Sequence, residues 1–289
     1  MARLKPRLLP CVFRTQAPAS VDELRFTHYA FRMYNTIIAP HFLEPRPFQH
    51  FPADSFPTLH PVWWLNSHFA VGGWSPLQRL SGMLTAHMTR IAPRAGFTWH
   101  PHRGLEIYTW VLEGTLHHED TTGGQGDIGP GEFQRMFSGE WIEHQELNRT
   151  DDPVRVIQIW FVAHPKHRGL EPHYQQPRRD EFCAHRTGDA TETMLIGEGS
   201  PMELHLVGGR LKAVTLAAGG TTELEAPHEN EDLFTYVTDG AGQVVHADQP
   251  TTLGHYDVLL ARASAPTVTL TASPDAPLHV LNFYLPKFL

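Results

Sequence analysis

The sequence predicts an all-β protein in which one antiparallel sandwich or barrel is built twice. Beyond residue 60 the chain consists of short segments rich in strand-forming residues, and glycine-containing turns separate them. These segments do not alternate with long amphipathic helices, as they would in a parallel βαβ protein. They also recur after a shift of 126 positions, which indicates a duplicated fold.

The first copy is predicted from five strand-like segments, at residues 82–92, 105–113, 114–120, 133–137 and 154–162. Two glycine-rich stretches between them, residues 120–124 and 129–132, are typical of tight turns. The second copy begins after Pro201. The 126-residue shift places residues 101–111 on residues 227–237, and Glu113-Gly114 on Asp239-Gly240.

Composition divides the chain into four predicted parts. Residues 1–58 are basic at first and rich in proline later, so we expect a largely irregular N-terminal extension. Residues 59–165 are predicted to form the first domain and residues 200–289 the second. The polar residues 166–199 are predicted to connect them, because domain boundaries commonly fall in such segments.

The overall composition argues against several classes of protein. The net charge of −8 does not favour nucleic acid as a partner. No apolar run approaches the roughly 20 residues of a membrane-spanning helix, and the start lacks the long apolar stretch of a secretory signal. Cys11 and Cys183 are the only cysteines, which indicates neither a disulfide framework nor a thiolate zinc site. We therefore expect a cytoplasmic, reducing setting.

Four polar side chains have a spacing that can bring them to one point. His100 and His102 are two residues apart, as are His144 and Glu146, so each pair can share one face of a strand. If the two strands lie side by side, three imidazoles and a carboxylate converge. This donor set suits Fe(II), Mn(II), Ni(II), Co(II) or Zn(II). Because the chain contains 20 histidines, spacing alone leaves satisfied core histidines as an equal alternative.

Two further pairs of residues have the same two-residue spacing, but we do not interpret them as metal ligands. His117 with Glu119, and His118 with Asp120, stand beside glycine-rich turns, and we interpret both pairs as solvated strand or turn residues. In the second copy Ala226 corresponds to His100, although His228 corresponds to His102. Residues 261–270, the counterpart of the His144 region, contain neither histidine nor glutamate. We therefore expect the second copy to keep the framework without the site.

Several ordered motifs resemble the pirin family of bicupins. They are His100-Pro101-His102-Arg103-Gly104, Val111-Leu112-Glu113-Gly114, residues 128–134 and Glu143-His144-Gln145-Glu146. Residues 64–69, 156–161 and 171–175 are also similar to family segments. The resemblance covers residues 60–180 strongly and residues 200–289 weakly.

The resemblance implies two tandem cupin barrels of the double-stranded β-helix or jelly-roll type, packed face to face, with short helices. It also implies one metal ion in the first barrel, most often iron, with Ni, Mn, Co, Cu or Zn as alternatives. By matching position, the metal ligands are His100, His102, His144 and Glu146. Glu106 stands where other cupins place a ligand carboxylate, but its expected role here is supporting or structural.

Three further features bear on the pocket. Arg135 stands where the family more often has an apolar or aromatic residue, which puts any borrowed substrate preference in doubt. Phe97, Met136 and Trp141 can line the pocket or fill the barrel, and we expect core packing for each.

The resemblance further implies a metal-dependent dioxygenase, with cleavage of flavonols of the quercetin 2,3-dioxygenase type as the expected reaction. Its substrates would be O2 and a small flavonol-like molecule, and Glu146 would act catalytically by accepting a proton. A second hypothesis is a non-enzymatic, iron-dependent redox sensor that regulates transcription through a protein partner. A metal-free sugar-binding or isomerase cupin is less favoured, because it leaves four convergent polar side chains without partners.

Overall fold

The computed structural model describes residues 46–206 and 208–287 of the chain. Most of the predicted N-terminal extension, residues 1–58, therefore lies outside the described residues, as does Cys11. Its described part contains strand β1 (Phe48–Phe51) and the short 3-10 helix η3 (Ala53–Ser55). Within the described ranges, no helix has the length and apolar character needed to cross a membrane.

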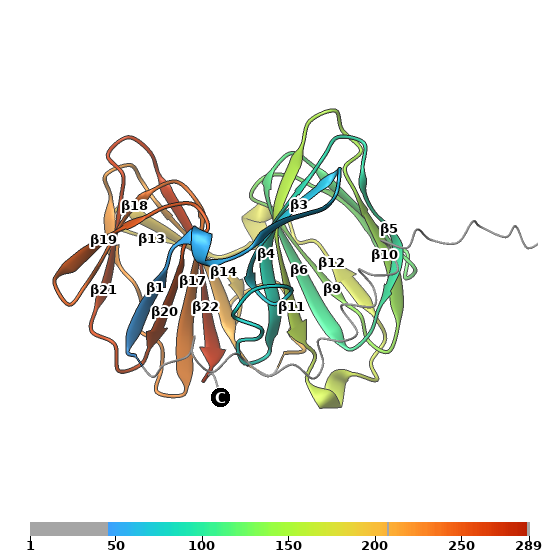
Figure 1. Cartoon of the computed structure of the whole chain (residues 1–289). Helices are drawn as coiled ribbons and strands as arrows, with labels where there is room; N and C mark the ends of the chain where they lie inside the picture. Colours follow the sequence, from blue (N-terminus) through green and yellow to red (C-terminus); the bar gives the residue numbers. More distant parts are fainter. Residues whose placement is uncertain (1–45, 207, 288–289) are drawn as a thin grey trace, which may run out of the picture.

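The chain folds into two lobes of β-sheet that lie next to each other (Figure 1). In the first lobe a seven-stranded sheet, in the order β12-β9-β6-β11-β4-β3-β2, accompanies a four-stranded sheet, in the order β5-β10-β7-β8. All strand pairs in both sheets are antiparallel. The strands are β2 (Thr58–Val62), β3 (Leu65–Val71), β4 (Met83–Ile91), β5 (Gly96–His102), β6 (Leu105–Glu113), β7 (Leu116–Asp120), β8 (Gln125–Ile128), β9 (Phe133–Phe137), β10 (Ile142–Leu147), β11 (Val154–Val162) and β12 (His173–Gln175).

The second lobe repeats this arrangement with sheets β1-β20-β17-β22-β15-β14-β13 and β16-β21-β18-β19. Its strands are β1, β13 (Ala184–Thr187), β14 (Ala190–Ile196), β15 (Arg210–Leu216), β16 (Thr221–Glu223), β17 (Glu231–Asp239), β18 (Gly242–His246), β19 (Gln249–Leu253), β20 (Val258–Arg262), β21 (Val268–Ala272) and β22 (Leu278–Pro286). Two more 3-10 helices, η4 (Pro165–His167) and η5 (Arg179–Glu181), lie between β11 and β13. The predicted all-β bicupin fold with short helices is confirmed.

The structure confirms the duplication that the sequence indicated. Strands β6 and β17 begin and end 126 residues apart and occupy the third position of their respective large sheets. One edge strand breaks the simple repeat. In the first lobe the edge strand β12 follows β11 in the chain, whereas in the second lobe β1 pairs with β20 from the N-terminal side. Figure 1 shows β1, in blue, within the orange lobe.

The strand pairing differs from the predicted domain boundaries at two places. Residues 166–199, predicted as a connector, contain β12 of the first lobe and β13 and β14 of the second. Strand β1, which falls in the predicted extension, completes the second lobe. Backbone donors and acceptors at a sheet edge favour strand pairing whatever the polarity of the side chains. Amino-acid composition alone therefore does not predict which polar segments pair at an edge.

Alternation along β11 explains how one strand serves both the lobe contact and the barrel interior. Ile157, Ile159 and Phe161 belong to the hydrophobic cluster shared by both lobes. Gln158 and Trp160 have the opposite parity and contact residues inside the first lobe, as described below. The strand is therefore apolar on one face and mixed on the other.

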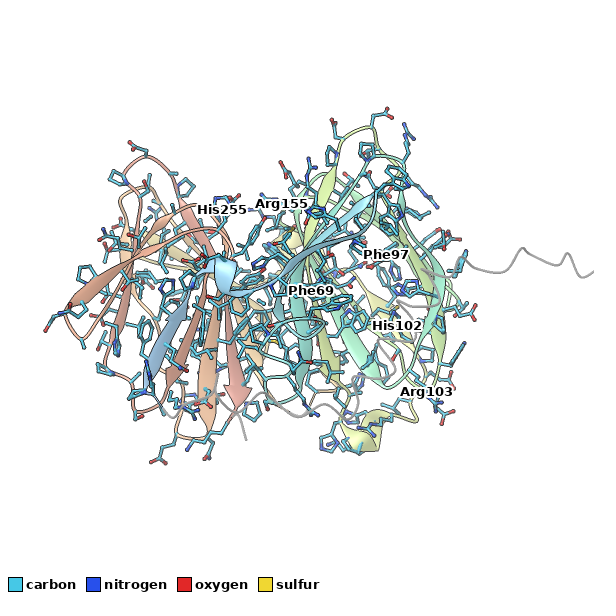
Figure 2. The ribbon with its side chains drawn as sticks, viewed as in Figure 1. Phe69, Phe97, His102, Arg103, Arg155 and His255 are labelled. Atoms are coloured by element: carbon cyan, nitrogen blue, oxygen red, sulfur yellow. The ribbon has the colours of Figure 1, made fainter. Side chains whose placement is uncertain are left out.

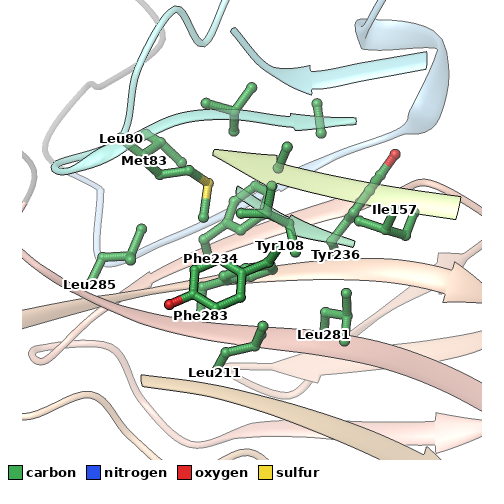
Figure 3. Close-up of a cluster of buried hydrophobic side chains, with 14 of the residues drawn as sticks. Leu80, Met83, Tyr108, Ile157, Leu211, Phe234, Tyr236, Leu281, Phe283 and Leu285 are labelled. Atoms are coloured by element: carbon green, nitrogen blue, oxygen red, sulfur yellow. The ribbon is translucent and has the colours of Figure 1, made fainter. Parts of the chain in front are cut away.

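The large sheets of the two lobes pack face to face through that shared cluster (Figure 3). Tyr108 of β6 and Phe234 of β17, which are 126 residues apart, are both fully buried in it. Ile157 of β11 and Leu281 of β22 are also present. Equivalent strands thus contribute equivalent core residues, and the removal of this apolar surface from water stabilises the lobe contact.

Polar contacts reinforce the lobe contact near its rim. The Arg155 guanidinium of β11 donates to the Tyr256 hydroxyl at 3.0 Å and to the Asp239 carboxylate at 3.4 Å. His255 lies 3.4 Å from the same carboxylate. Arg155 and His255 mark this junction in Figure 2.

Candidate metal centre

The predicted ligands lie on the four-stranded sheet of the first lobe, which is on the side away from the second lobe (Figure 1). His144 of β10 is the cross-strand partner of His100 on β5. A register shift between His144 and Glu146 then places Glu146 opposite Phe97 on β5 and opposite His118 on β7. Strands β5, β10 and β7 therefore bring three histidine-bearing segments to one place, as the spacing predicted for two of them.

A glycine allows the strands to approach closely at this point. Gly96 has a φ of 156°, and a Cβ atom at this position would lie 2.3 Å from the Glu146 carbonyl oxygen. Any side chain would push β5 away from β10, because backbone atoms cannot yield at that distance. Gly96 thus keeps the two ligand-bearing strands in register.

The three predicted histidines form a compact cluster. The ring centroids of His100 and His102 are 4.9 Å apart, those of His100 and His144 are 4.4 Å apart, and those of His102 and His144 are 5.0 Å apart. One ring nitrogen from each lies within 4.8 Å of the others, a spacing that can hold a metal ion. Figure 2 shows His102 inside the first lobe, below Phe97.

Two of the three imidazoles, His102 and His144, are held neutral, the state in which imidazole binds metal. Nε2 of His102 and both ring nitrogens of His144 are buried and have no hydrogen-bond partner among the described residues. Burial, with the neighbouring histidines adding to it, lowers the pKa of His102 and of His144 well below the ordinary value. His100 has its Nδ1 2.7 Å from the Thr98 carbonyl oxygen, which leaves Nε2 directed elsewhere. Unpaired neutral nitrogens in a buried site fit a metal ion that is bound by imidazole.

Glu146 is fixed by hydrogen bonds from three strands of the large sheet. Its Oε1 accepts from the Gln134 amide at 2.8 Å, and its Oε2 accepts from the Gln158 amide at 2.7 Å. The Thr109 hydroxyl adds a longer contact of 3.4 Å. Trp160 donates in turn to Gln158 and packs its ring edge-on to His102. These partners hold the carboxylate and one imidazole in place, as the outer groups of metal sites commonly do.

The structure also brings in a residue that sequence reasoning set aside. His118 and Asp120, interpreted as solvated, are 0% and 4% exposed. Nitrogen and oxygen atoms of His118, His144 and Glu146 lie within 4.8 Å of one another and form a second, fully buried group that can hold a metal. That interpretation was wrong because β7 alternates buried and partly buried residues from Leu116 to Asp120. The apolar Leu116, two places before His118, was the sequence signal that this face points inward.

The interpretation of His117 and Glu119 as solvated residues agrees better with the structure. His117 and Glu119 have the opposite parity on β7 and are partly exposed. His117 lies 2.7 Å from the Asp127 carboxylate, whose side chain is 70% exposed. These residues are directed toward the surface of the sheet and not toward the histidine cluster.

Glu106 has a structural role and lies on the wrong face of β6 to bind the metal. It shares its parity with Tyr108, which belongs to the lobe contact, while Thr109 of opposite parity reaches Glu146. Glu106 is fully buried and pairs with Arg135, whose Nε lies at 3.1 Å. The Tyr108 hydroxyl and the His205 backbone N–H also donate to it. Arg135 therefore faces away from the histidine cluster.

The three expected core residues differ from one another. Met136 is buried in a hydrophobic cluster with Ile107, so its expected core role is confirmed. Phe97 is partly buried and packs edge-on to Trp64, with its ring 6.2 Å from that of His100. Trp141 is 53% exposed, so the expectation of core packing was wrong there.

The second lobe lacks this constellation among its described residues. Its strands β18 and β21 place Val244 opposite Leu270, as β7 and β10 place His118 opposite Glu146. Both residues are buried in a hydrophobic cluster with Val268. His228, the counterpart of His102, is exposed. Among the described residues, the second lobe therefore repeats the strand pairing of the first with apolar side chains at these two positions.

The fold and the cluster together define a bicupin in which one barrel can hold a metal ion. The sequence profile of the Pirin family matches residues 76–161. A protein of Mycobacterium tuberculosis named "putative quercetin 2,3-dioxygenase" is 36% identical over 167 residues, which cover 56% of this chain and 67% of that protein. The chain belongs to the pirin family.

Two further comparisons extend this assignment. Quercetin 2,3-dioxygenase of Escherichia coli is 42% identical over 86 residues, which cover 29% of this chain and 36% of that protein. The crystal structure of the bacterial pirin YhhW from Escherichia coli in complex with nickel(II) superposes with a TM-score of 0.67 at 24% identity, over 83% of this chain and 99% of that one. The structural likeness supports the fold.

Proposed function

We propose that this protein is a metal-dependent dioxygenase that cleaves a flavonol-like small molecule in the manner of quercetin 2,3-dioxygenase. The observation that carries the proposal is the group of buried, unpaired imidazole nitrogens beside a carboxylate that is fixed by two amides. The names of the relatives from Mycobacterium tuberculosis and Escherichia coli support the choice of reaction.

The metal ligands in this proposal are His100, His102, His144 and Glu146. Fe(II) is the ion that we favour, and the nickel complex of YhhW supports Ni(II) as an alternative. Three nitrogens and one oxygen suit either ion and leave room for further ligands. When bound, the ion would bind the substrate oxygens and act as a Lewis acid toward them.

Glu146 is the residue that we assign to proton transfer. A flavonol must lose the proton of its 3-hydroxyl group before it reacts with O2, and Glu146 is the carboxylate of the cluster. The Gln134 amide and the longer Thr109 contact occupy Oε1, and the Gln158 amide occupies one lone pair of Oε2. The second lone pair of Oε2 would bind the metal and, when the carboxylate loosens from the metal, would accept this proton. The two amides also fix the orientation of the carboxylate, which favours transfer along one direction.

The test is oxygen-dependent turnover of quercetin by the metal-loaded protein. We expect the wild type to release carbon monoxide and the depside product, and Glu146→Ala to lose at least about 100-fold of this rate, the usual contribution of a general base. Glu143→Ala is the matched control, because Glu143 lies on the same strand with opposite parity. The proposal is wrong if metal-loaded wild type produces no more carbon monoxide than Glu146→Ala does.

A further inference from the structure

A cavity of about 220 Å³ lies between the two lobes, at the edge of the hydrophobic cluster that they share. Strand β6 lines it from the first lobe, and strands β15, β17 and β22 line it from the second. Trp110 of β6 lines the cavity and has the parity of Tyr108, which belongs to the lobe contact. Thr109, of opposite parity, reaches Glu146 on the other face of β6. The cavity is therefore separate from the histidine cluster.

The interior of this inter-lobe cavity is apolar and lies between two facing sheets. Trp110 and Leu112 of β6 and Ala213 of β15 are partly buried and pack against the shared cluster. Leu281 of β22 belongs to that cluster (Figure 3). A space between two sheet faces favours a flat molecule, and the Trp110 indole offers a ring on which such a molecule can pack. Because an apolar cavity of about 150 Å³ can hold benzene, a single substituted ring fits here.

His279 of β22 and Thr215 of β15 add polar groups to the second-lobe side of the cavity. Nδ1 of His279 lies 3.0 Å from the Thr215 hydroxyl, and Nε2 has no hydrogen-bond partner among the described residues. Burial lowers the pKa of His279, so its imidazole is neutral near pH 7. A neutral imidazole with one free nitrogen can form a hydrogen bond with a hydroxyl group of a ligand.

Arg179 of η5 brings a positive charge to the cavity. Its guanidinium lies beside the turn at Gly131, where an added Cβ atom would be 3.5 Å from Nη1. The nearby carboxylates of Asp180 and Glu181 pair with Arg178 instead. Arg179 is exposed and forms no ion pair within residues 46–206 and 208–287. Its guanidinium is therefore available to a carboxylate.

Asp239 is the acidic residue of the cavity lining, and it already has partners. Its carboxylate accepts hydrogen bonds from the Arg155 guanidinium at 3.4 Å and from the Gly240 backbone N–H at 2.9 Å. His255 also lies 3.4 Å from it. The charged group of the described lining that lacks a partner is thus the Arg179 cation, which favours a negatively charged ligand over a positively charged one.

We propose that the inter-lobe cavity is a binding site for a small aromatic carboxylate. The ring of this ligand packs against Trp110, its carboxylate pairs with Arg179, and His279 binds a hydroxyl group of the ring. The site is distinct from the proposed dioxygenase site, because it needs neither the metal ion nor the residues that hold it.

The test is a titration of the full chain with 4-hydroxybenzoate, followed through the indole ¹H–¹⁵N NMR signals of the seven tryptophans. Trp110→Phe assigns the Trp110 signal. Trp160 packs edge-on to His102, so its signal reports binding at the histidine cluster. We expect the Trp110 signal to shift with a Kd of about 1 mM or lower, while the Trp160 signal stays in place. The neutral analogue 4-hydroxybenzamide should bind at least about 5-fold more weakly.

Two variants test the residues that the proposal assigns. Arg179→Gln should weaken binding of 4-hydroxybenzoate by at least about 5-fold, because it removes the cation. Arg178→Gln is the matched control and should bind as the wild type does, since Arg178 is the preceding residue and pairs with Asp180. Ala213→Leu places a larger side chain in the cavity and should abolish binding.

The inference is overturned by a Trp110 signal that does not move at ligand concentrations up to about 10 mM. Equal binding of the amide, or full affinity in Arg179→Gln, would contradict the assignment of a carboxylate. If Ala213→Leu does not fold, Arg179→Gln still decides, because Arg179 is exposed. A shift of the Trp160 signal alone would contradict the inter-lobe site and leave the metal site standing, whereas a failure to cleave quercetin does not affect the inter-lobe site.

Discussion

The interior of the first lobe is polar where the interior of the second lobe is apolar, although the two lobes share one strand order. His118 and Glu146 face each other in the first lobe, and Val244 and Leu270 occupy the equivalent pair in the second. The second lobe shows that this framework packs well with apolar side chains at these positions. The polar cluster is therefore not needed for the fold, which points to a separate function.

One buried cross-strand pair is polar in both lobes, but its hydrogen bonds differ between them. Thr109 and Gln158 are cross-strand partners in the first lobe, and Thr235 and Asn282 are their equivalents in the second. In the second lobe the Thr235 hydroxyl donates to the Asn282 side chain at 2.7 Å. In the first lobe both residues instead donate to Glu146. The same framework position thus satisfies itself in one lobe and supports a carboxylate in the other.

The largest effect is expected when a carboxylate is placed in the apolar lobe. Leu270→Glu places an acidic group where the native side chain is fully buried among hydrophobic residues. This position does not have the two amide donors that hold Glu146 in the first lobe. We expect a loss of about 4–5 kcal/mol in the free energy of unfolding, measured by urea denaturation at pH 7. Leu270→Met is the volume-matched control and should lose less than about 1.5 kcal/mol. A small loss in Leu270→Glu would mean that the second lobe can also hold a carboxylate.

The buried ion pairs of the two lobes should differ in the same assay. Arg135 and Glu106 are both fully buried, so Arg135→Met leaves an unpaired carboxylate and should cost about 3–5 kcal/mol. In the second lobe Asp232 pairs with Arg262 at 3.6 Å, and the Arg262 side chain is 29% exposed. The Asp232 side chain is itself only 1% exposed, so Arg262→Met also leaves a buried carboxylate, but it should cost less than Arg135→Met because the partly exposed Arg262 side chain admits water to the pair. Equal losses would contradict the difference that we draw between the two pairs.

A smaller effect is expected in the pH dependence of the metal-free protein. Burial lowers the pKa of His144 in the folded state, whereas the unfolded value is near 6.5, so the unfolded chain binds more protons below that pH. The free energy of unfolding should therefore fall as the pH drops from 7.5 to 5. His144→Val, which copies Val268 of the second lobe, should reduce this slope by up to about 1.4 kcal/mol per pH unit.

The exposed His228 supplies the control for this measurement. His228→Ala removes one exposed histidine outside the cluster, and the slope should fall more in His144→Val than in His228→Ala. A slope in His144→Val that equals the wild-type slope would show that His144 is not held neutral by the fold.

The sequence was sufficient for the elements that depend on local pattern. The 126-residue repeat predicted β6 and β17. The two-residue spacings predicted two ligand-bearing strands, and these are the neighbouring strands β5, with His100 and His102, and β10, with His144 and Glu146. What it missed depends on pairing between distant segments. The entry of β1 into the second lobe, and the inward face of β7 that buries His118, follow from cross-strand register. Register between segments this far apart is not encoded in either segment alone.

The most direct test of the account is the metal content of protein purified without chelator. We predict about one transition-metal ion per chain in the wild type. His228→Ala should hold the same amount, because in this account the second lobe contributes no ligand. His144→Ala should hold none, because His144 belongs both to the cluster with His100 and His102 and to the group with His118 and Glu146. Metal retained at the wild-type level in His144→Ala, or a wild type that is empty and cannot be loaded with Fe(II) or Ni(II), would contradict a metal site in the first lobe.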